Sequence, residues 1–379
     1  MYSSNSHFFT SGGSENHIRE LSLALVSLGH RVTVFCNSPY TKRKLFISEN
    51  GVNYKIWPTP KIVNARSFVS EGLFRIIQMM LNTKTIRNIR DSNADIFHQH
   101  DFISNYLTTL SLSFMRCPVI LTNHLGEYLL LEKYLPHLAL RFFLKPYKYI
   151  IGPSRELTPE TMHSNVTTIY NGFNEYFYKH SPIARETKRR ELDLEKNDLF
   201  VVVPRRWAPT KGVLYAAKAA KILAEYNSEI KWAFLCCNSP GFDSYKSKIS
   251  ETLDGLSTVK TFESQTSEEL ARFFNAADVA LFPSLLEAVS IASLEAMACG
   301  AMILSTRVGG MSEILTNGIN SMLIPERDSY AIVKALLKIS KNRDTYRLIA
   351  QEGRNLVSKK FEWKSVAEQT LLVYKSILR

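Results

Sequence analysis

The sequence predicts an α/β protein of two domains, each built on a parallel β-sheet. Short apolar segments such as 199–203 and 279–282 alternate with helical segments, which is the pattern of strands buried on both faces of a sheet. The chain has 379 residues, enough for two domains with full cores. Its composition, 45% hydrophobic and 22% charged, is typical of globular proteins.

A glycine pair before a helix opens the first domain. We predict a helix with Ser14 as its N-cap and Gly29 as its stop, followed by a strand at 31–36. The free amides at a helix start and the helix dipole both favour an anion, so Gly12 and Gly13 indicate a phosphate site.

The segment MYSSNSHFFT, residues 1–10, stands before the glycine pair. A sheet of this type needs an apolar central strand that runs into the glycine loop, and this segment is polar and short. We therefore expect the central strand to be missing, which would leave strands at 31–36 and 96–98 facing a gap. A start codon placed too late would explain this, and more apolar residues are then expected in the upstream reading frame.

Three histidines lie near the ends of two predicted strands. The strand at 96–98 leads to His98 and His100, and the strand at 119–122 is followed closely by His124. Histidines are common metal ligands, but no carboxylate stands at a familiar ligand spacing from them. We therefore expect no metal, and a structural role for His98.

The charge balance favours anionic ligands. Lys and Arg exceed Asp and Glu by 47 − 35 = 12, and the excess is spread along the chain. The chain has no Arg-rich arm of the kind that would indicate nucleic-acid binding. Anionic substrates and anionic membrane surfaces are therefore the expected partners. No apolar run is long enough to span a membrane and no secretory signal is visible, which predicts a cytoplasmic protein. The five cysteines are scattered and suggest no disulfide framework.

Two apolar stretches of the first domain also carry basic residues. Residues 67–81 are followed by Lys84, Arg87 and Arg90, and residues 125–149 are interspersed with Lys and Arg. Each stretch could be a core-packed connection or a helix that lies on a membrane surface. We expect peripheral, salt-sensitive contact with anionic membrane through one of them.

A polar and charged segment at 178–198 marks the crossing into the second domain. We predict domains at 1–180 and 181–360, with a closing helix in 361–379. The second domain begins with a strand at 199–203, and the cations Arg205, Arg206 and Lys211 follow it.

These three cations stand before a helix that begins near Gly212. Cations are unfavourable at a helix amino end, because the dipole is positive there. They become favourable when a bound anion lies between them and the helix amides. The segment therefore predicts an anion site.

Two carboxylates, Glu287 and Glu295, follow the strand at 279–282. Glu287 lies in the loop, and Glu295 lies on the apolar side of the helix predicted at 290–299. A carboxylate there is costly unless it is hydrogen-bonded. Hydroxyl groups of a ligand and an ordinary ion pair would both satisfy it, and spacing alone does not choose between them.

This region resembles the E-x7-E segment of retaining glycosyltransferase family 4, whose members have the GT-B fold. The matching residues are Pro283, Ser284, Glu287, Leu294, Glu295, Ala296, Met297, Ala298, Gly300, Gly309, Gly310 and Glu313. Residues 12–35 resemble the opening helix and second strand of the same family. Arg206 and Lys211 match its R-x-x-x-x-K-G element, with Arg205 in place of a preceding Gly. The sequence departs from the family at Ala288-Val289-Ser290, where G-F-G is common.

The resemblance implies two Rossmann-like domains facing across a cleft, with the closing helix crossing back to the first domain. It implies a retaining glycosyltransferase that moves a sugar from a nucleotide-sugar to a hydroxyl of a glycan or lipid-linked acceptor, in polysaccharide, glycolipid or cell-envelope biosynthesis. The expected catalytic residues are His124, Arg206, Lys211 and Glu287. The expected donor-binding residues are Gly12, Gly13, Arg205, Ala288, Val289, Ser290, Ile291 and Glu295. No cofactor is expected, since such enzymes generally work without a metal.

In this scheme Arg206 and Lys211 stabilise the departing diphosphate. Glu287 binds the donor sugar, Glu295 binds the ribose, and His124 contacts the transferred sugar. Two alternatives use the same donor site. A GT-B-type nucleotide-sugar epimerase would release free epimerised sugar without an acceptor. A catalytically weakened accessory protein would bind a nucleotide-sugar without turnover.

Overall fold

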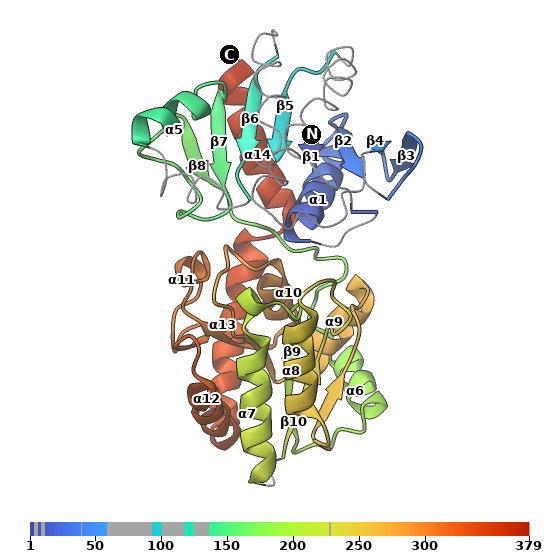
Figure 1. Cartoon of the computed structure of the whole chain (residues 1–379), viewed down its shortest axis with the longest axis vertical. Coiled ribbons are helices and arrows are strands. Elements are labelled where there is room, and N and C mark those ends of the chain that lie inside the picture. The colour runs from blue at the N-terminus through green and yellow to red at the C-terminus, as the bar shows by residue number, and fades with distance from the viewer. Residues whose placement is uncertain are drawn as a thin grey trace. The chain divides into compact units, whose positions relative to one another are not determined.

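The computed structural model describes residues 1–3, 7–8, 12–38, 40–58, 93–100, 117–124, 136–226 and 229–378. The chain divides into two compact units (Figure 1). Unit 1 consists of Met1–Asn171 together with Trp363–Arg379, and unit 2 consists of Gly172–Glu362. The predicted α/β architecture, with a mainly parallel sheet in each of two units, is confirmed.

The sheet of unit 1 has the strand order β3-β4-β2-β1-β5-β6-β7-β8. Its strands are β1 (Tyr2–Ser3), β2 (Thr33–Ser38), β3 (Leu45–Glu49), β4 (Val52–Pro58), β5 (Phe97–His100), β6 (Val119–Thr122), β7 (Tyr149–Gly152) and β8 (Val166–Thr168). All neighbouring strands run parallel except β3 and β4, which form an antiparallel pair. The carboxyl ends of the parallel strands therefore meet at one edge of the sheet.

The predicted gap in this sheet is not found, so the expectation of a missing central strand is wrong. The short strand β1 lies between β2 and β5, with Tyr2 opposite both Phe35 and Gln99. The amide of Phe35 donates to the carbonyl of Met1 at 2.8 Å. Tyr2 thus pairs with both neighbours and Ser3 pairs with Cys36 of β2, so two residues are enough to join the flanking strands. A segment this short carries no apolar periodicity by which the sequence could reveal it.

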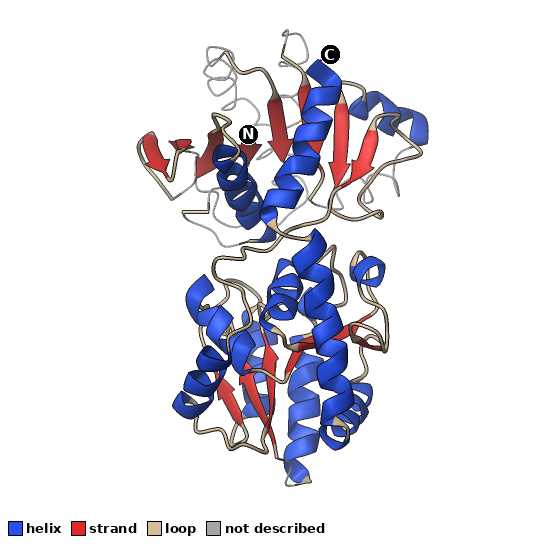
Figure 2. Cartoon of the chain, turned by 180° about the vertical axis from the view of Figure 1, so that it is seen from behind, coloured by secondary structure: helices blue, strands red, loops and turns tan. Residues whose placement is uncertain are grey.

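The described helices of unit 1 are α1 (Gly13–Ser27), α5 (His137–Leu144) and α14 (Trp363–Leu378). Figure 2 shows α14 lying along one face of the sheet beside α1, the two helices being in contact. The buried side chains Leu21 and Leu25 of α1 and Val366 of α14 belong to this layer. The N-cap of α1 is Gly12 rather than the predicted Ser14, because Ser14 lies inside the first turn and donates to Glu15.

Unit 2 has a fully parallel sheet with the order β11-β10-β9-β12-β13-β14. Its strands are β9 (Leu199–Val203), β10 (Ile230–Phe234), β11 (Val259–Thr261), β12 (Val279–Phe282), β13 (Met302–Thr306) and β14 (Met322–Ile324). Its helices are α6 (Pro182–Glu191), the 3-10 helix η2 (Pro209–Lys211), α7 (Val213–Glu225), α8 (Asp243–Leu253), α9 (Ser267–Ala276), α10 (Ile291–Cys299), α11 (Met311–Ile314), α12 (Ser329–Lys341) and α13 (Arg343–Lys360). Helices cover both faces of the sheet, so β9 and β12 are buried along their whole length (Figure 2).

The structure divides the chain at Asn171 and Glu362, whereas the sequence boundaries were residues 180 and 360. The reason lies in the short segment that leads into unit 2. Phe173 donates its amide to the carbonyl of Phe361, and the ring of Tyr178 packs against Phe274 of α9. These contacts attach residues from Gly172 onward to unit 2, before the composition becomes polar.

Candidate functional site

Two loops leave the carboxyl edge of the unit 2 sheet and are fastened to each other. The amide of Leu285, after β12, donates to the carbonyl of Thr210, after β9, at 2.8 Å. Gly212 has φ +64°, and a Cβ built on it would lie 1.9 Å from the carbonyl oxygen of Pro283. Only glycine fits this close approach, and the approach places Lys211 beside the β12 loop.

Glu287 is the centre of a compact charged group in these loops. Its carboxylate forms an ion pair with Arg205 and accepts from the Lys211 ammonium at 2.8 Å. The hydroxyl of Ser284 lies 3.4 Å from the same oxygen. We call Arg205, Lys211, Ser284 and Glu287 the Glu287 cluster.

Arg205 is held from two further sides. One of its guanidinium nitrogens donates to the Ser290 hydroxyl at 3.0 Å, and the guanidinium carbon lies 5.6 Å from the centre of the Phe282 ring. The residue is 7% exposed. A cation buried to this degree needs its carboxylate partner, so Arg205 also fixes the loop that carries Glu287.

The ionisation of the Glu287 cluster follows from burial and from charge. Burial raises the pKa of the Glu287 carboxyl, but the charges of Arg205 and Lys211 outweigh it and hold the pKa below its usual value. Burial and the Arg205 charge lower the pKa of Lys211, and Glu287 opposes them. With both cations charged, two positive groups face one carboxylate and the net charge is 2 − 1 = +1. An anionic ligand would balance this excess.

Arg206, the cation that the sequence matched to the family motif, stands apart from the cluster. It is exposed, and its side chain makes no hydrogen bond or ion pair with any part of the chain that the structure describes. The arginine fixed beside Glu287 is instead Arg205. The sequence predicted both Arg205 and Arg206 as site residues. In the structure Arg205 is buried and Arg206 is exposed.

The loop that replaces the family's G-F-G leads into α10. Val289 is buried, Ser290 is the N-cap residue of α10, and Ile291 is the first helical residue. The Ser290 carbonyl accepts from the amide of Ser293 at 3.1 Å. Ala288 and Ile291 are partly exposed beside the Glu287 cluster in the sequence. The amino end of α10, which favours an anion, therefore follows closely after Glu287 in the sequence.

Glu295 lies on the buried side of α10 and is 7% exposed. Burial raises the pKa of the Tyr178 hydroxyl, and the charge of Glu295 and a hydrogen bond with it add to this rise. The same charge adds to the effect of burial in raising the pKa of the Cys299 thiol. The structure thus gives the carboxylate a tyrosine hydroxyl as a partner, which spacing could not reveal.

In unit 1 the amino end of α1 carries an anion of its own. Gly12 and Gly13 stand at the helix start as predicted, but the Glu15 carboxylate folds back over them. The Ser14 hydroxyl donates to this carboxylate at 3.0 Å, and a Cβ on Gly12 would lie 2.2 Å from it. A phosphate at these amides would have to displace Glu15.

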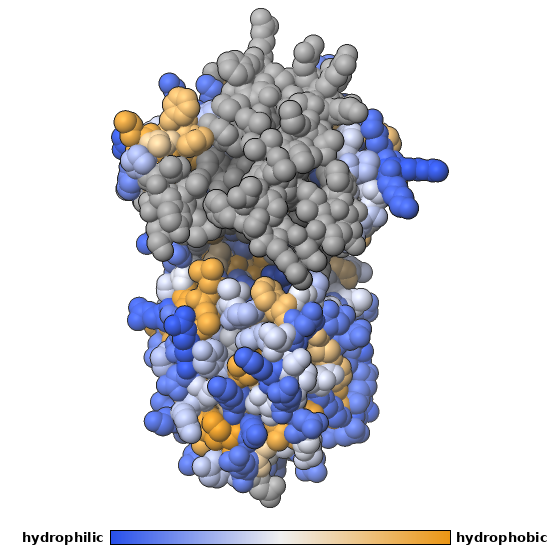
Figure 3. All heavy atoms as spheres, viewed as in Figure 1, coloured by the Kyte–Doolittle hydropathy of each residue, from blue (hydrophilic) through white to orange (hydrophobic). Residues whose placement is uncertain are grey.

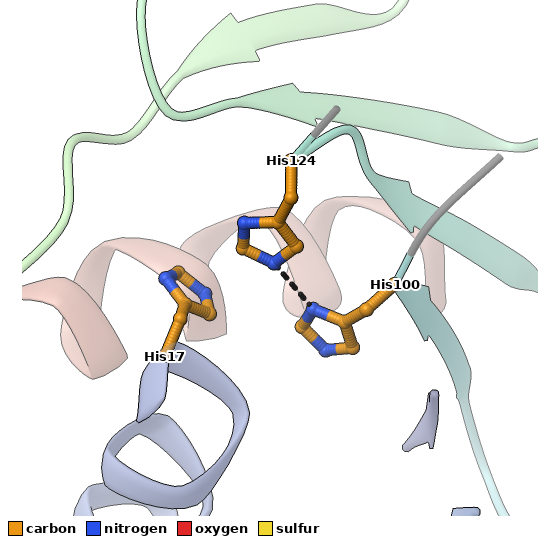
Figure 4. A group of neighbouring side chains, drawn as sticks. All are labelled: His17, His100 and His124. Atoms are coloured by element: carbon orange, nitrogen blue, oxygen red, sulfur yellow. Dashed lines mark hydrogen bonds between the residues drawn. The ribbon is translucent and has the colours of Figure 1, made fainter. Parts of the chain in front are cut away.

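Four histidines of unit 1 lie near one another: His98 is hydrogen-bonded to residues of other types, and His17, His100 and His124 lie together. His98 is bonded through both ring nitrogens, to Tyr374 of α14 at 2.6 Å and to Thr122 of β6 at 2.7 Å. His100 and His124 share a hydrogen bond of 3.0 Å between Nδ1 and Nε2 (Figure 4). His17 of α1, which the sequence did not single out, lies against them, with its ring centre 4.5 Å from that of His124.

Two family models match the chain, one over its first half and one over its second. Residues 11–176 match the model described as Glycosyltransferase Family 4, and residues 184–356 match the model described as Glycosyl transferases group 1. An uncharacterized glycosyltransferase of Methanocaldococcus jannaschii is 24% identical over 381 residues, which cover 96% of this chain and 94% of the relative. The chain is a glycosyltransferase of the GT-B type.

Solved structures show the same fold for this glycosyltransferase. Sucrose-phosphate synthase from Thermosynechococcus elongatus superposes with a TM-score of 0.78 at 18% identity, covering 97% of this chain and 94% of the other. The Anabaena protein HepE, solved in complex with UDP-glucose, gives a TM-score of 0.75 at 16% identity, covering 99% and 98% of the two chains. At such identities the likeness establishes the GT-B fold alone.

Several residues that build the site of this glycosyltransferase were not predicted as site residues. Ser284 and Gly212 were noticed in the sequence as parts of motifs, but only the structure shows that they position Glu287 and Lys211. Asn171, whose side-chain oxygen accepts from Nδ1 of His17 at 2.9 Å, was not predicted either. Side-chain partners 154 positions apart leave no local signal in the sequence.

Proposed function

We propose that this glycosyltransferase moves a sugar from a nucleotide-sugar donor to a hydroxyl of a glycan or lipid-linked acceptor, with retention at the anomeric carbon. The observation that supports this is the Glu287 cluster, where two cations are held by one carboxylate at the carboxyl edge of a parallel sheet. Ligands of open α/β sheets bind at this edge. The net positive charge suits the diphosphate of such a donor.

The cations act where charge develops. When the bond from the anomeric carbon to the diphosphate oxygen breaks, that oxygen takes the electron pair. Lys211 and the exposed Arg206 stabilise the resulting anion. The acceptor oxygen forms the new bond to the anomeric carbon, and its proton leaves to the departing phosphate.

Glu287 serves as a binding group in this proposal. The charges of Arg205 and Lys211 outweigh the effect of burial and hold its pKa low. Glu287 therefore stays ionised and can accept hydrogen bonds from sugar hydroxyls. A carboxylate paired with two cations is a weak nucleophile. This supports a transfer without a covalent glycosyl intermediate on Glu287.

Glu295 and the start of α10 complete the donor site in the proposal. The Glu295 carboxylate has capacity for more than one hydrogen bond, so it can accept from ribose hydroxyls while Tyr178 donates to it. The amides of the segment from Ala288 to Ile291 bind donor oxygens.

The test combines a nucleotide-sugar panel with product analysis. A donor that binds at 100 times its dissociation constant should stabilise the protein by about 2.7 kcal/mol in thermal unfolding. With that donor and an acceptor, NMR of the product should show the anomeric configuration of the donor. An inverted product would refute retention. Free epimerised sugar without an acceptor would establish an epimerase, and binding without turnover would establish an accessory protein.

We also propose that the first domain contacts anionic membrane through α5. Leu138 and Phe142 stand four positions apart on α5, and they are 79% and 69% exposed. Hydrophobic side chains are visible at the position of α5 in Figure 3. Arg141 on the same helix and Lys145 and Lys148 just after it are exposed as well. Exposed apolar side chains framed by cations are typical of helices that bind membrane surfaces.

None of the described helices is long and apolar enough to cross a membrane. The other stretch considered for membrane contact, residues 67–81, lies outside the described residues, as does 125–135. The surface proposed for contact is therefore the described part, α5 with Lys145 and Lys148.

Vesicle sedimentation tests the membrane proposal. Each basic residue near an anionic surface contributes about 1 kcal/mol, so raised salt should release the protein from anionic vesicles. Phe142→Ser should weaken binding, and Tyr330→Ser is the matched control, because Tyr330 is 68% exposed on unit 2. Equal and salt-independent binding to neutral and anionic vesicles would rule out this mode of attachment.

A further inference from the structure

Three histidines from three separate elements of unit 1 converge on one point. His17 lies on α1, His100 ends β5, and His124 follows β6 (Figure 4). One ring nitrogen of each can be chosen so that all three lie within 4.8 Å of one another. We call these residues the three-histidine cluster.

The ring of His17 is oriented by a partner behind it. Its Nδ1 lies 2.9 Å from the side-chain oxygen of Asn171, and an amide oxygen can only accept. Nδ1 therefore carries the proton, and Nε2 presents its lone pair. A histidine that ligates a metal typically donates its other N–H in this way, which fixes its tautomer and its ring orientation.

His100 and His124 place two ring nitrogens 3.0 Å apart. A hydrogen bond between two imidazoles holds one proton between two nitrogens. A metal ion can take the place of that proton and accept a lone pair from each ring, while the proton moves to the other nitrogen of the same imidazole. Burial lowers the pKa of His17 to about 4 and those of His100 and His124 well below the usual value, so all three rings are neutral near pH 7.

We propose that His17, His100 and His124 bind one transition-metal ion of the zinc type. Zinc–nitrogen bonds of about 2.0–2.1 Å in a tetrahedral site put the ligand nitrogens about 3.4 Å apart. The His100–His124 separation is already close to this, so small ring movements complete the site. Imidazole ligands without a carboxylate favour zinc, copper or nickel over magnesium and calcium.

Three histidine ligands leave a fourth position open in tetrahedral zinc. The proposal goes beyond the proposed function, in which Lys211 and Arg206 rather than a metal ion stabilise the diphosphate. His124 is also the residue predicted to contact the transferred sugar. Since one imidazole cannot bind zinc and the sugar through the same lone pair, we expect zinc to inhibit transfer.

Equilibrium dialysis of the full chain against Zn²⁺, followed by metal analysis, tests the site. The wild type should retain one tight zinc per chain. His17→Gln should lose at least tenfold in zinc affinity, and Asn171→Ala should lose about 10–100-fold while keeping all three ligands. His30→Gln, which removes an exposed histidine after α1, should bind like the wild type.

Zinc binding by His17→Gln or Asn171→Ala at wild-type affinity would overturn the proposal, as would a wild type without a tight site. Thermal unfolding in a chelator checks that each variant folds. If His17→Gln does not fold, Asn171→Ala still tests the site. Donor affinity measured in the same chelator separates this result from the proposed function. If a variant loses zinc binding and keeps its donor affinity, the result concerns the metal site alone and not the proposed function.

Discussion

The carboxyl edges of the two sheets hold their buried polar groups in different ways. In unit 2, Glu287 is surrounded by the charged groups of Arg205 and Lys211. In unit 1, His100 and His124 are neutral rings that share a hydrogen bond. A charged cluster with an excess of cations attracts an anion over a distance, whereas neutral rings act only on a group in direct contact.

The two edges should therefore respond differently to substitution. Removing one member of a buried ion pair leaves a charge without compensation, which costs much more than removing one neutral hydrogen-bond partner.

The largest effect is expected for Glu287→Gln. The side chains of Arg205 and Lys211 are 8% and 17% exposed, and both would lose their carboxylate. Breaking a buried pair typically costs about 3–5 kcal/mol. Urea unfolding should show a loss in the lower part of this range because Lys211 is partly solvated. A change below about 0.5 kcal/mol, the usual size at an exposed site, would show that the cluster is not an interior ion pair.

Gly212→Ala should have the next largest effect. A residue other than glycine at φ +64° costs about 1–3 kcal/mol, and the Cβ would overlap the carbonyl of Pro283. The two loops should separate, so donor affinity should fall together with stability. Gly241→Ala is the matched control, since Gly241 also has positive φ but no atom within 4 Å of its Cβ. Equal losses in both variants would mean that backbone strain alone, and not loop contact, matters at Gly212.

Thr122→Val examines the neutral edge. It removes the hydroxyl that lies 2.7 Å from Nε2 of His98 and leaves that nitrogen without this partner. The expected loss of stability is about 1–3 kcal/mol, smaller than for Glu287→Gln. Differential scanning calorimetry of both variants gives the comparison directly. A larger loss for Thr122→Val would reverse the proposed ranking of the two edges.

The smallest effect is a change with pH. The pKa of Glu287 is lowered in the folded state, so its ionised form stabilises the fold above the unfolded pKa of about 4.3. This contribution is lost as pH falls through the folded pKa. The stability difference between wild type and Glu287→Gln should thus be full near pH 7 and shrink below about pH 4. A difference that stays constant from pH 7 to pH 3 would contradict the assignment of an ionised Glu287.

Strands β9 and β12 of unit 2 could be predicted because each is buried along its whole length and ends at a clear signal. The segments at 199–203 and 279–282 are the observed β9 and β12, and α10 ends before Gly300, which has φ +88° as a left-handed cap requires. Thr266 caps α9 and accepts from the amide of Glu269 at 3.2 Å, at the T-x-x-E spacing of a capping box. Local patterns were sufficient for these elements.

Unit 1 was harder because its signals are weak or distant. The hairpin of β3 and β4 was not predicted, although Asn50-Gly51 is a strong turn signal and both residues have positive φ, 49° and 83°. The strand β1 is too short for any pattern. His17 and His124 are far apart in the sequence, and only the tertiary structure brings them into contact. The cluster of cations in unit 2 was predicted as a group, but its geometry, with Arg205 buried and Arg206 exposed, depends on packing against Phe282.

Donor affinity of the Arg206→Ala/Lys211→Ala double variant tests whether these two cations hold the diphosphate of the donor. Each side chain should contribute a charge-assisted contact of about 1.5–3 kcal/mol to the diphosphate. Calorimetric titration with the donor found in the panel should show affinity reduced at least 100-fold. Lys218→Ala, which removes an exposed lysine of α7, should bind as the wild type does. Unchanged donor affinity and turnover in the double variant would show that these cations do not hold the diphosphate.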